Sequence, residues 1–251
     1  MSAGKDVMVR VSGLKKRFGD QWVLRGVDME VPRGGTTVVL GRSGCGKSVL
    51  LKHFIGLFRA DSGRVEVDGV DISSMDEERL VGVRQKVGML FQGAALFDSM
   101  SVGGNLAFPL RERGVRDEGE IRDRVREALA MVGLEGEEEK MPDQLSGGMR
   151  KRVGLARTIV SRPACILYDE PTTGLDPIAT DSINHLIRRL QERLKVTSVV
   201  VTHDMRTAFH TADHMVFLHE GSVYAEGVPG EIRSSSDPIL RDFIEGKSGE
   251  G

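Results

Sequence analysis

The sequence predicts an α/β fold in which helices cover a mainly parallel β-sheet. Short apolar runs rich in β-branched residues recur along the chain, stretches of helical periodicity separate several of them, and polar residues follow the runs directly. Strands that alternate with helices form parallel sheets, and the ligands of such sheets bind beyond the carboxyl ends of the strands. We therefore expect the functional residues among the polar positions that end these runs.

The N-terminal half is expected to consist mostly of strands around one glycine-rich turn. Residues 36–57 predict a buried strand, a turn and a helix. Alternation of apolar and polar residues about Asp68-Gly69 predicts a hairpin, whereas residues 93–116, rich in Gly, Phe and Arg, are expected to be irregular. Strands are predicted at residues 7–14, 22–31, 63–72 and 86–92.

The C-terminal half is predicted to alternate helices and strands. An amphipathic helix is expected from residue 117 and another at residues 183–194, because apolar side chains recur there at helical spacing. The last two strands are expected to form a hairpin about Glu220-Gly221, and the tail from residue 228 is expected to be partly disordered. The strands of this half are predicted within residues 164–171, 197–204 and 213–227.

Length, composition and charge limit the classes of protein. The 251 residues, 39% hydrophobic and 29% charged, are enough for one sizeable globular core. A formal net charge of −2 argues against nucleic acid as a partner. Two cysteines without metal-ligand spacing favour a reducing compartment. We expect no signal peptide and no membrane span, because we find neither an N-terminal apolar core nor an apolar run of roughly 18 residues.

Residues 41–48, GRSGCGKS, match the G-x-x-x-x-G-K-S pattern and are called the phosphate loop below. Its glycines let backbone N–H groups face phosphate oxygens, Lys47 would reach the β- and γ-phosphates, and the Ser48 hydroxyl would ligate Mg²⁺. An apolar strand before the loop and a helix after it favour this interpretation over a glycine-rich surface turn. The residues expected to bind the nucleotide are Gly41, Arg42, Ser43, Gly44, Cys45, Gly46, Lys47, Ser48 and Val49.

Four polar residues end other apolar strands. A magnesium-nucleotide site needs a carboxylate for the metal and a group that orients or activates water, and Asp169 and Glu170 offer one candidate for each task. The alternative is a charged strand end without chemistry. His203 ends the next strand and would contact a γ-phosphate, although a lone histidine is more often structural. Gln92 ends a strand in the same manner.

A second helix start able to hold an anion lies in DQLSGGMRKR, residues 143–152, called the signature segment below. A helix start offers free backbone N–H groups and a partial positive charge. The residues at this start are Ser146, Gly147 and Gly148, and no lysine of the phosphate-loop kind accompanies them. The sequence pattern alone does not explain why one chain carries two such sites.

The order of these motifs resembles that of ABC-type ATPase subunits: a phosphate loop, a glutamine, L-S-G-G, a carboxylate pair and a histidine. The resemblance covers roughly residues 7–227. It implies a RecA-like parallel-sheet core with an antiparallel β subdomain and a helical signature subdomain at about residues 93–160. It also implies an ATPase domain at residues 1–227, a short C-terminal tail at residues 228–251, and ATP and Mg²⁺ as cofactors.

The resemblance implies roles for single residues. Glu170 would be the catalytic carboxylate, His203 the switch histidine, and Gln92 a sensor of the metal and of the attacking water. The metal would be held by Ser48, Gln92 and Asp169.

Two subunits of that family pack head to tail, and each ATP lies between the phosphate loop of one chain and the signature segment of the other. Residues 146–148 would therefore close on the γ-phosphate of the partner's site, and Asp176 in GLDP would communicate across a homodimer. Phe18 matches the aromatic residue that stacks on adenine. For Phe18 the alternative is a core aromatic, and Trp22 is a nearby competitor.

FQGAALFDSMSV and MPDQLSGGMRKR resemble the Mla/Mce-type ATPases, which energise lipid movement between membranes. Met149, where the commonest signature has glutamine, is a feature of that branch. The resemblance implies a peripheral location on the cytoplasmic face of the inner membrane, two copies of an integral-membrane permease and a lipid-binding Mce-type substrate component. Phe97, Met100 and Phe108 would form an apolar patch that touches the permease, the alternative being a locally packed loop.

Other functions remain to be weighed. The chain would also suit the ATPase subunit of an importer for amino acids or other polar solutes. An ABC-type ATPase that acts on DNA or ribosomes is less favoured, because we find no coiled coil, zinc module or second ATPase unit in the sequence. A small-molecule kinase would leave the signature segment unexplained, and Glu170 disfavours a nucleotide-binding module that does not hydrolyse.

Overall fold

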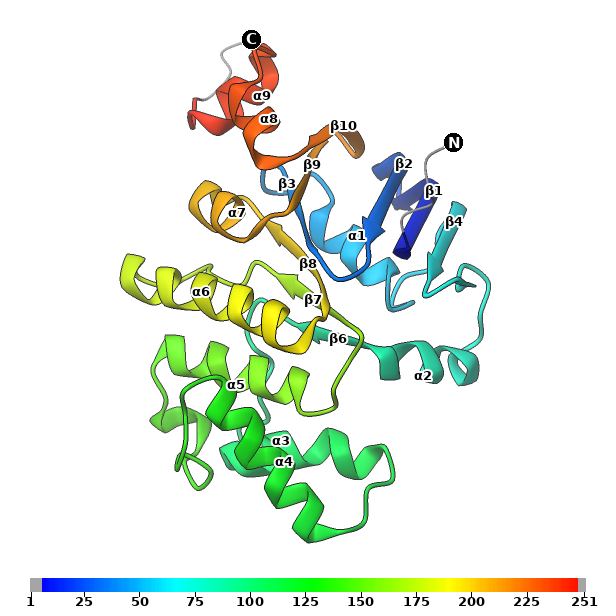
Figure 1. The fold of residues 1–251 in the computed structure, drawn as a ribbon. Helices are drawn as coiled ribbons and strands as arrows, with labels where there is room; N and C mark the ends of the chain where they lie inside the picture. The colour runs from blue at the N-terminus through cyan, green and yellow to red at the C-terminus, as the bar shows by residue number, and fades with distance from the viewer. Residues whose placement is uncertain (1–5, 248–251) are drawn as a thin grey trace.

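The computed structural model describes residues 6–247 and contains two β-sheets (Figure 1). The larger sheet has the strand order β10-β9-β3-β8-β7-β6. Its first five strands in sequence are parallel, and β10 pairs antiparallel with β9 at one edge. The strands are β3 (Thr36–Leu40), β6 (Val87–Leu90), β7 (Cys165–Asp169), β8 (Thr197–Thr202), β9 (His214–His219) and β10 (Ser222–Gly227). The predicted α/β fold with a mainly parallel sheet is confirmed.

The central strands of the larger sheet are buried on both faces. Every residue of β3, β7 and β8 is buried, as expected for short, mainly apolar or β-branched runs in a parallel sheet. Alternate residues of β3 contribute to two separate core clusters: Val38 and Leu40 lie in one, and Val39 lies in the other. The sheet therefore separates two hydrophobic cores, one on each face.

The smaller sheet is antiparallel and has the strand order β2-β1-β4-β5. Asp68 and Gly69, both at positive φ (53° and 75°), make the predicted tight turn between its last two strands. Lys86 and Arg33 both donate hydrogen bonds to the Asp68 carboxylate and hold the pKa of that group below its usual value. The strands are β1 (Val7–Phe18), β2 (Gln21–Pro32), β4 (Ser62–Val67) and β5 (Val70–Asp71).

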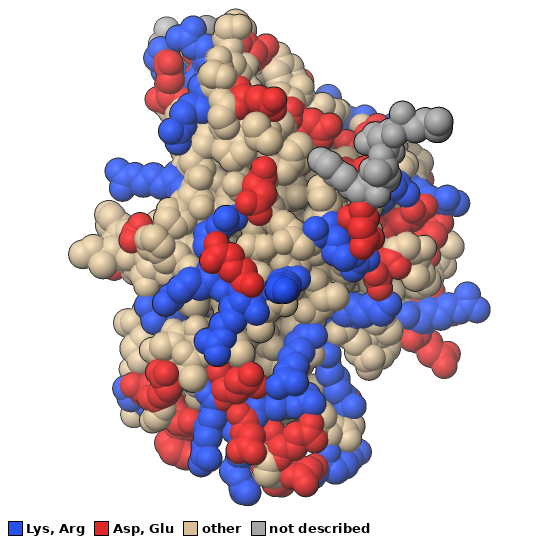
Figure 2. Space-filling model, viewed as in Figure 1, with Lys and Arg blue, Asp and Glu red and all other residues tan. Residues whose placement is uncertain are grey.

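Three helices gather at the end of the molecule away from the smaller sheet, drawn in green in Figure 1. They are α3 (Val102–Glu112), α4 (Glu118–Met131) and α5 (Gly147–Ile159). The predicted amphipathic helix α4 buries Ile121, Val125 and Leu129. Figure 2 shows acidic and basic side chains mixed densely over this end of the face in view. The other helices before the tail are α1 (Lys47–His53), α2 (Glu77–Lys86), α6 (Pro177–Leu194), α7 (Met205–Thr211) and the 3₁₀ turn η1 (Pro142–Gln144).

The expectation that residues 93–116 are irregular is wrong, because α3 lies within them. Two glycines and Pro109 occur inside this helix, and such residues ordinarily disfavour a helix interior. Burial overrides that local preference: Val102, Leu106 and Leu110 lie one helical turn or two apart and are almost completely buried. The Ser101 side chain caps the helix by accepting a hydrogen bond from the backbone N–H of Gly104.

The expectation of a partly disordered tail is also wrong for the residues that the structure describes. The tail forms α8 (Pro229–Ser234) and α9 (Pro238–Ile244). Ile232 and Leu240 are buried in the core cluster that includes the helical end of the molecule. Asp237 caps α9 through the backbone N–H of Leu240 and accepts a hydrogen bond from the Tyr224 hydroxyl. Residues 248–251 lie outside the described range.

None of the helices within residues 6–247 combines the length and the apolar character needed to cross a membrane.

Candidate functional site

Three strands of the larger sheet end at the same edge and bring the predicted polar residues to it. In the parallel register Leu40 of β3 lies opposite Thr202 of β8, and Asp169 of β7 lies opposite Val201. The phosphate loop, Glu170 and His203 each follow one of these strands directly. The edge is therefore the meeting point of motifs that lie far apart in the sequence, as the parallel topology predicts.

The phosphate loop has a backbone path that excludes side chains at two of its glycines. A Cβ atom on Gly41 would lie 2.4 Å from the carbonyl oxygen of Leu218 and 2.5 Å from the Cys45 sulfur. Gly46 has φ 106°, and a Cβ there would lie 2.8 Å from a methyl carbon of Leu24. Arg42, Ser43 and Gly44 are exposed at the turn of the loop. The loop is thus held by packing at its base and open at its tip.

Lys47 is buried, and its ammonium group lies inside the curve of the loop. Its Nζ donates hydrogen bonds to the carbonyl oxygens of Gly41 (2.8 Å) and Arg42 (3.1 Å). The same Nζ lies 3.5 Å from Oε1 of Glu170. A cation held at this place faces the position that a phosphate bound by the loop would take.

The Ser48 hydroxyl and the Asp169 carboxylate meet although 121 residues separate them in the chain. Ser48 Oγ donates a hydrogen bond to Asp169 Oδ1 at 2.6 Å, and Asp169 is 5% exposed. Two adjacent oxygen ligands, one of them charged, fit Mg²⁺, which prefers oxygen and keeps several waters. The donor set therefore suits a magnesium ion beside the phosphate loop.

Glu170 has an unusual backbone conformation for a residue with a side chain. Its φ is 48°, in the left-handed region, and its N–H donates to the carbonyl oxygen of Val201 at 3.0 Å. The carboxylate lies between two basic groups: Oε2 is 3.0 Å from Nδ1 of His203, and Oε1 faces Lys47. Left-handed strain at a non-glycine residue persists only where the surroundings enforce it, and it is common at active sites. The strain thus points to a functional role for this residue.

Gln92 is connected to the same edge through its backbone. Its carbonyl oxygen accepts a short hydrogen bond from the Nζ of Lys151, which also lies 3.5 Å from the carbonyl oxygen of Glu170. Lys151 is 6% exposed. Burial lowers the pKa of its ammonium group, and the nearby Asp169 and Glu170 carboxylates oppose that shift.

Lys151 is a site residue that the sequence analysis missed. It lies in the basic part of the signature segment, beyond residues 146–148, to which the sequence analysis assigned a function. A hint was present in the spacing, because Lys151 follows Gly147 by one helical turn and precedes the buried Leu155 by another. From within α5 it joins the segment after β6 to the segment after β7.

The segment that begins at Gln92 is pinned to α5 and α3. Ala94 and Ala95 both have positive φ (61° and 48°), and Arg157 of α5 donates to both of their carbonyl oxygens. The completely buried Asn105 of α3 accepts a hydrogen bond from the Phe97 N–H and donates to three carbonyl oxygens of the same segment. We call residues 92–101 the glutamine loop.

Phe97 and Phe108 are exposed and contact each other. Their ring centroids lie 5.0 Å apart in an edge-to-face arrangement, and 42% and 36% of their surfaces are exposed. Met100 is half-buried, and its N–H donates to the carbonyl oxygen of Phe97 at 3.1 Å. The predicted apolar patch is present at the surface, while the hydrogen bonds of Asn105 show that the loop is also locally packed. The structure therefore agrees in part with each of the two interpretations, an exposed apolar patch and a locally packed loop.

The structure does not bring the signature segment to the phosphate loop of its own chain. Ser146 is exposed and caps α5 by accepting a hydrogen bond from the Met149 N–H at 3.3 Å. The closest contacts of added Cβ atoms on Gly147 and Gly148 would be with Leu175 and Ala179, at the start of α6. Within residues 6–247 no hydrogen bond or ion pair links residues 146–148 to the phosphate loop.

Asp176 and the two candidate aromatics lie at the surface. Asp176 caps α6 by accepting hydrogen bonds from two backbone N–H groups at 2.9 Å. Phe18 and Trp22 are 43% and 42% exposed at the tip of the β1–β2 hairpin, so the interpretation of Phe18 as a core aromatic is wrong. Phe18 packs edge-to-face on Phe58. Both aromatics are free to contact a ligand.

Comparisons with known proteins agree with this geometry. Residues 24–173 match the family described as ABC transporter. The probable ribonucleotide transport ATP-binding protein mkl of Mycobacterium tuberculosis is 43% identical over 96% of this chain and 67% of its own length. The intermembrane phospholipid transport system ATP-binding protein MlaF of Haemophilus influenzae is 39% identical over 96% of this chain and 91% of its own length.

A solved structure shows the same fold. It is a dimeric ATP-binding cassette in a post-hydrolysis state bound to ADP and Pi. Its TM-score with this chain is 0.81 at 32% identity, and the match covers 88% of this chain and 99% of the other.

Proposed function

The chain belongs to the ABC transporter family, whose ATP-binding subunits hydrolyse ATP, and from this premise we propose that two copies of it bind two ATP molecules between them and energise phospholipid transport by a membrane permease. One observation supports the proposed site of ATP hydrolysis. Lys47, Ser48, Asp169, Glu170 and His203 come from three strand ends and meet at one edge of the sheet. These are the groups that phosphoryl transfer to water requires.

The residues divide the work by position. The phosphate loop and Lys47 hold the β- and γ-phosphates, while Ser48, Asp169 and Gln92 hold Mg²⁺, which when bound offsets the charge on the phosphate oxygens. Glu170 accepts a proton from the attacking water or orients that water, and His203 contacts the γ-phosphate. The contact between His203 and Glu170 at 3.0 Å supports these roles, because it keeps the carboxylate oriented toward the loop.

The second half of each site comes from another copy of the chain. Residues 146–148 form a helix start at the surface, and within residues 6–247 no carboxylate forms a hydrogen bond or ion pair with it. The exposed Asp176 directly follows Leu175, which lies next to Gly147. A helix start of this kind stabilises a γ-phosphate. ATP would therefore join two chains head to tail, and Phe18 or Trp22 would stack on adenine. The dimeric solved relative bound to ADP and Pi supports this arrangement.

The dimer would act on the membrane through the glutamine loop. Gln92 adjoins the nucleotide edge, and the exposed Phe97 follows it on the glutamine loop, which is pinned to α5 and α3. The exposed Phe108 of α3 packs against Phe97. A closing movement at the nucleotide would thus reach an apolar surface suited to a permease helix. We place the chain at the cytoplasmic face of the inner membrane, on two permease copies that work with a lipid-binding Mce-type component.

The phospholipid assignment rests on the relative named for intermembrane phospholipid transport, which matches almost its full length. A second candidate is an importer of polar solutes. The relative named for ribonucleotide transport is slightly more similar in sequence and supports that alternative. Both candidates share the ATPase chemistry and differ only in the permease and its substrate.

The chemical role of Glu170 is tested by Glu170→Gln. The variant should bind ATP normally and hydrolyse it roughly a hundredfold or more slowly, because the amide cannot accept the proton. Glu192→Gln, the same change at an exposed carboxylate of α6, is the control. Steady-state ATPase rates and nucleotide titration measure the two quantities. Activity near that of the wild type would remove Glu170 from this role.

The split site is tested by mixing two inactive chains. In a Glu170→Gln background, chains that carry Lys47→Ala or Ser146→Arg should each fail to dimerise with ATP in size-exclusion chromatography. A mixture should recover an ATP-dependent dimer, because one composite site keeps both an intact phosphate loop and an intact signature segment. If the mixture stays monomeric while Glu170→Gln alone dimerises, the head-to-tail proposal fails.

The permease contact and the substrate are tested by co-purification from native membranes. Phe97→Glu should abolish co-purification of a polytopic membrane protein, whereas Val81→Glu, at an exposed apolar residue of α2, should not. Phospholipid should co-purify with the wild-type complex. A permease with a dedicated polar-solute receptor would overturn the lipid assignment and leave the ATPase assignment intact.

A further inference from the structure

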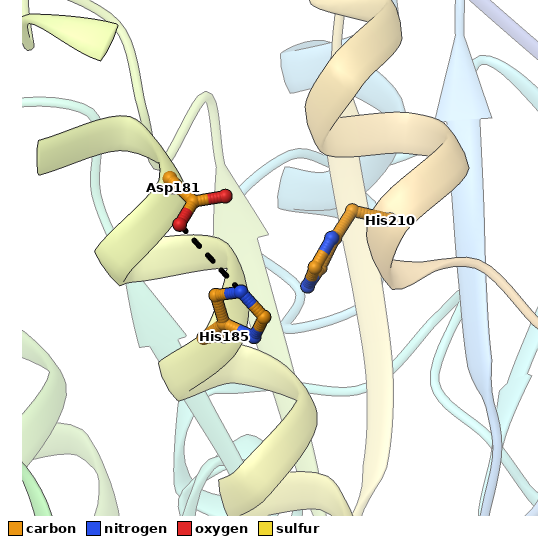
Figure 3. Close-up of side chains that lie close together, drawn as sticks. All are labelled: Asp181, His185 and His210. Carbon is orange, nitrogen blue, oxygen red and sulfur yellow. Dashed lines mark ion pairs between the residues drawn. The ribbon is translucent and has the colours of Figure 1, made fainter. Parts of the chain in front are cut away.

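Asp181, His185 and His210 lie together on the surface (Figure 3). Asp181 and His185 come from α6, and His210 comes from the neighbouring α7. One potential ligand atom from each residue lies within 4.8 Å of the other two, and all three side chains are exposed. None of these residues takes part in the proposed hydrolysis.

Two of the three groups form a chelating pair on one helix. Asp181 and His185 are four residues apart, so they lie on the same face of α6 in successive turns. Their carboxylate oxygen and Nε2 atom are 3.5 Å apart. The His210 ring crosses that of His185 at an angle of 82°, with a centroid distance of 4.4 Å. Figure 3 shows the His210 ring directed from α7 toward the pair.

The two helices that carry the cluster are joined independently of it. Arg188 of α6 donates to the carbonyl oxygen of Thr211 (3.2 Å) and to the Asp213 carboxylate (2.9 Å), just after α7. The buried hydroxyl of Thr172, in the segment that leads to α6, contacts that of Thr207 in α7 at 3.0 Å. The backbones that carry the three ligands are therefore held in place, and a bound ion needs only small side-chain rotations.

We propose that Asp181, His185 and His210 form a binding site for a divalent transition metal, with Zn²⁺ as the best-fitting ion. Two imidazoles and one carboxylate are zinc ligands of ordinary type, and water would complete a tetrahedral shell. Ligand atoms of such a shell lie roughly 3.3 Å apart, given metal–ligand bonds of about 2.0–2.1 Å. Magnesium and calcium prefer oxygen ligands only, so they would bind this site poorly.

A metal at this place would link two segments of the nucleotide site from outside. Helix α7 begins two residues after His203, and α6 begins directly after Asp176. The ion would thus tie together the helices that follow these two residues without touching either. The proposed metal site does not depend on whether the chain energises transport of lipid or of another substrate.

Zinc binding to the full chain, purified without a histidine tag and free of nucleotide, tests the proposal. Calorimetric titration with Zn²⁺ should give one ion per chain. The Tm should rise by roughly 5–10 °C when free zinc is one hundred times Kd. Titration with Mg²⁺ at the same concentration should leave the Tm unchanged, because Mg²⁺ prefers oxygen ligands.

Variants separate this cluster from the other histidines and from Cys45. His185→Ala and His210→Ala should each weaken zinc binding by tenfold or more, because losing even an outer-shell partner of a metal ligand costs roughly 10- to 100-fold. His219→Ala on β9 should bind zinc like the wild type. The Tm without zinc should stay unchanged in all three variants. Absence of zinc binding, or binding that survives the double variant H185A/H210A, would overturn the proposal.

Discussion

Replacing Lys151 by methionine should slow ATP hydrolysis roughly tenfold to a hundredfold while the fold keeps nearly its full stability. Methionine has an unbranched chain of similar length, fills the same buried space and is compatible with a helix. It removes the only donor group that joins the carbonyl oxygens of Gln92 and Glu170 within the described residues. The backbone that positions the predicted water-activating carboxylate would then lose its tie to the glutamine loop.

The structure gives two opposing contributions to stability. Both carbonyl oxygens lose the Lys151 donor, but that of Glu170 keeps the hydrogen bond from the Thr173 N–H at 3.3 Å. The cost therefore falls on the Gln92 carbonyl oxygen, and a buried acceptor left unpaired costs about 1–3 kcal/mol. Against this, Lys151 is 6% exposed, and removing a buried ammonium group relieves a desolvation penalty of several kcal/mol. The two effects offset each other, so the free energy of unfolding should change by less than about 2 kcal/mol. The rate of hydrolysis depends instead on the position of the Glu170 carboxylate, and a displacement of about 1 Å lowers such a rate roughly a hundredfold.

The assay separates positioning from packing. The kcat should fall while KM for ATP stays within about twofold, because the phosphate loop and Lys47 are untouched. Urea unfolding of the same samples measures stability, and Lys140→Met, at a half-buried surface lysine paired with Glu137, is the matched control. A kcat within twofold of the wild type would show that Lys151 only fills space. A loss of activity matched by a loss of several kcal/mol would show a purely structural role.

Three further changes test other parts of the structure. Gly41→Ala should lower the free energy of unfolding by about 1–3 kcal/mol and weaken ATP binding, because its Cβ would lie 2.4 Å from the Leu218 carbonyl oxygen; an unchanged urea midpoint would contradict this. Burial raises the pKa of the Cys45 thiol and raises that of Cys165 to about 12. Iodoacetamide at pH 8 should therefore alkylate both cysteines more slowly than it alkylates a free thiol. Labelling of either cysteine at the free-thiol rate would refute the burial argument. Asp68→Asn should lower the free energy of unfolding at pH 7 by no more than about 1 kcal/mol, because the pKa of this carboxyl is lowered in the folded state. The difference from the wild type should vanish as the pH falls through the folded-state pKa. A difference that grows in acid would mean that the pKa shift has the opposite sign.

Local patterns were sufficient wherever the physical cause is local. The phosphate loop is predictable because its tight turn needs backbone conformations that glycine adopts easily, such as φ 106° at Gly46. The hairpin about Asp68-Gly69 is predictable for the same reason. Strands β3 and β8 are predictable from their runs of β-branched residues and β7 from its apolar run, as is typical of buried strands in a parallel sheet.

Elements whose cause is tertiary escaped the sequence analysis. Helix α3 contains Pro109 and two glycines, and it forms because Val102, Leu106 and Leu110 are buried against the rest of the core. The helices of the tail form for the same reason, with Ile232 and Leu240 buried. Propensity is a weak prior for such segments, because burial of apolar side chains outweighs it.

The sequence by itself determined the chemistry of the nucleotide site: the phosphate loop, the carboxylate pair, the histidine and the second helix start are all legible in the order of residues. Only the tertiary structure decided which of these groups meet. Ser48 and Asp169 approach to 2.6 Å across 121 residues of chain because parallel strands share one edge, and register is a property of the whole sheet. The same packing buries Lys151 beneath that edge and leaves Ser146 exposed, since burial depends on every element that surrounds a side chain and not on its own neighbours in sequence.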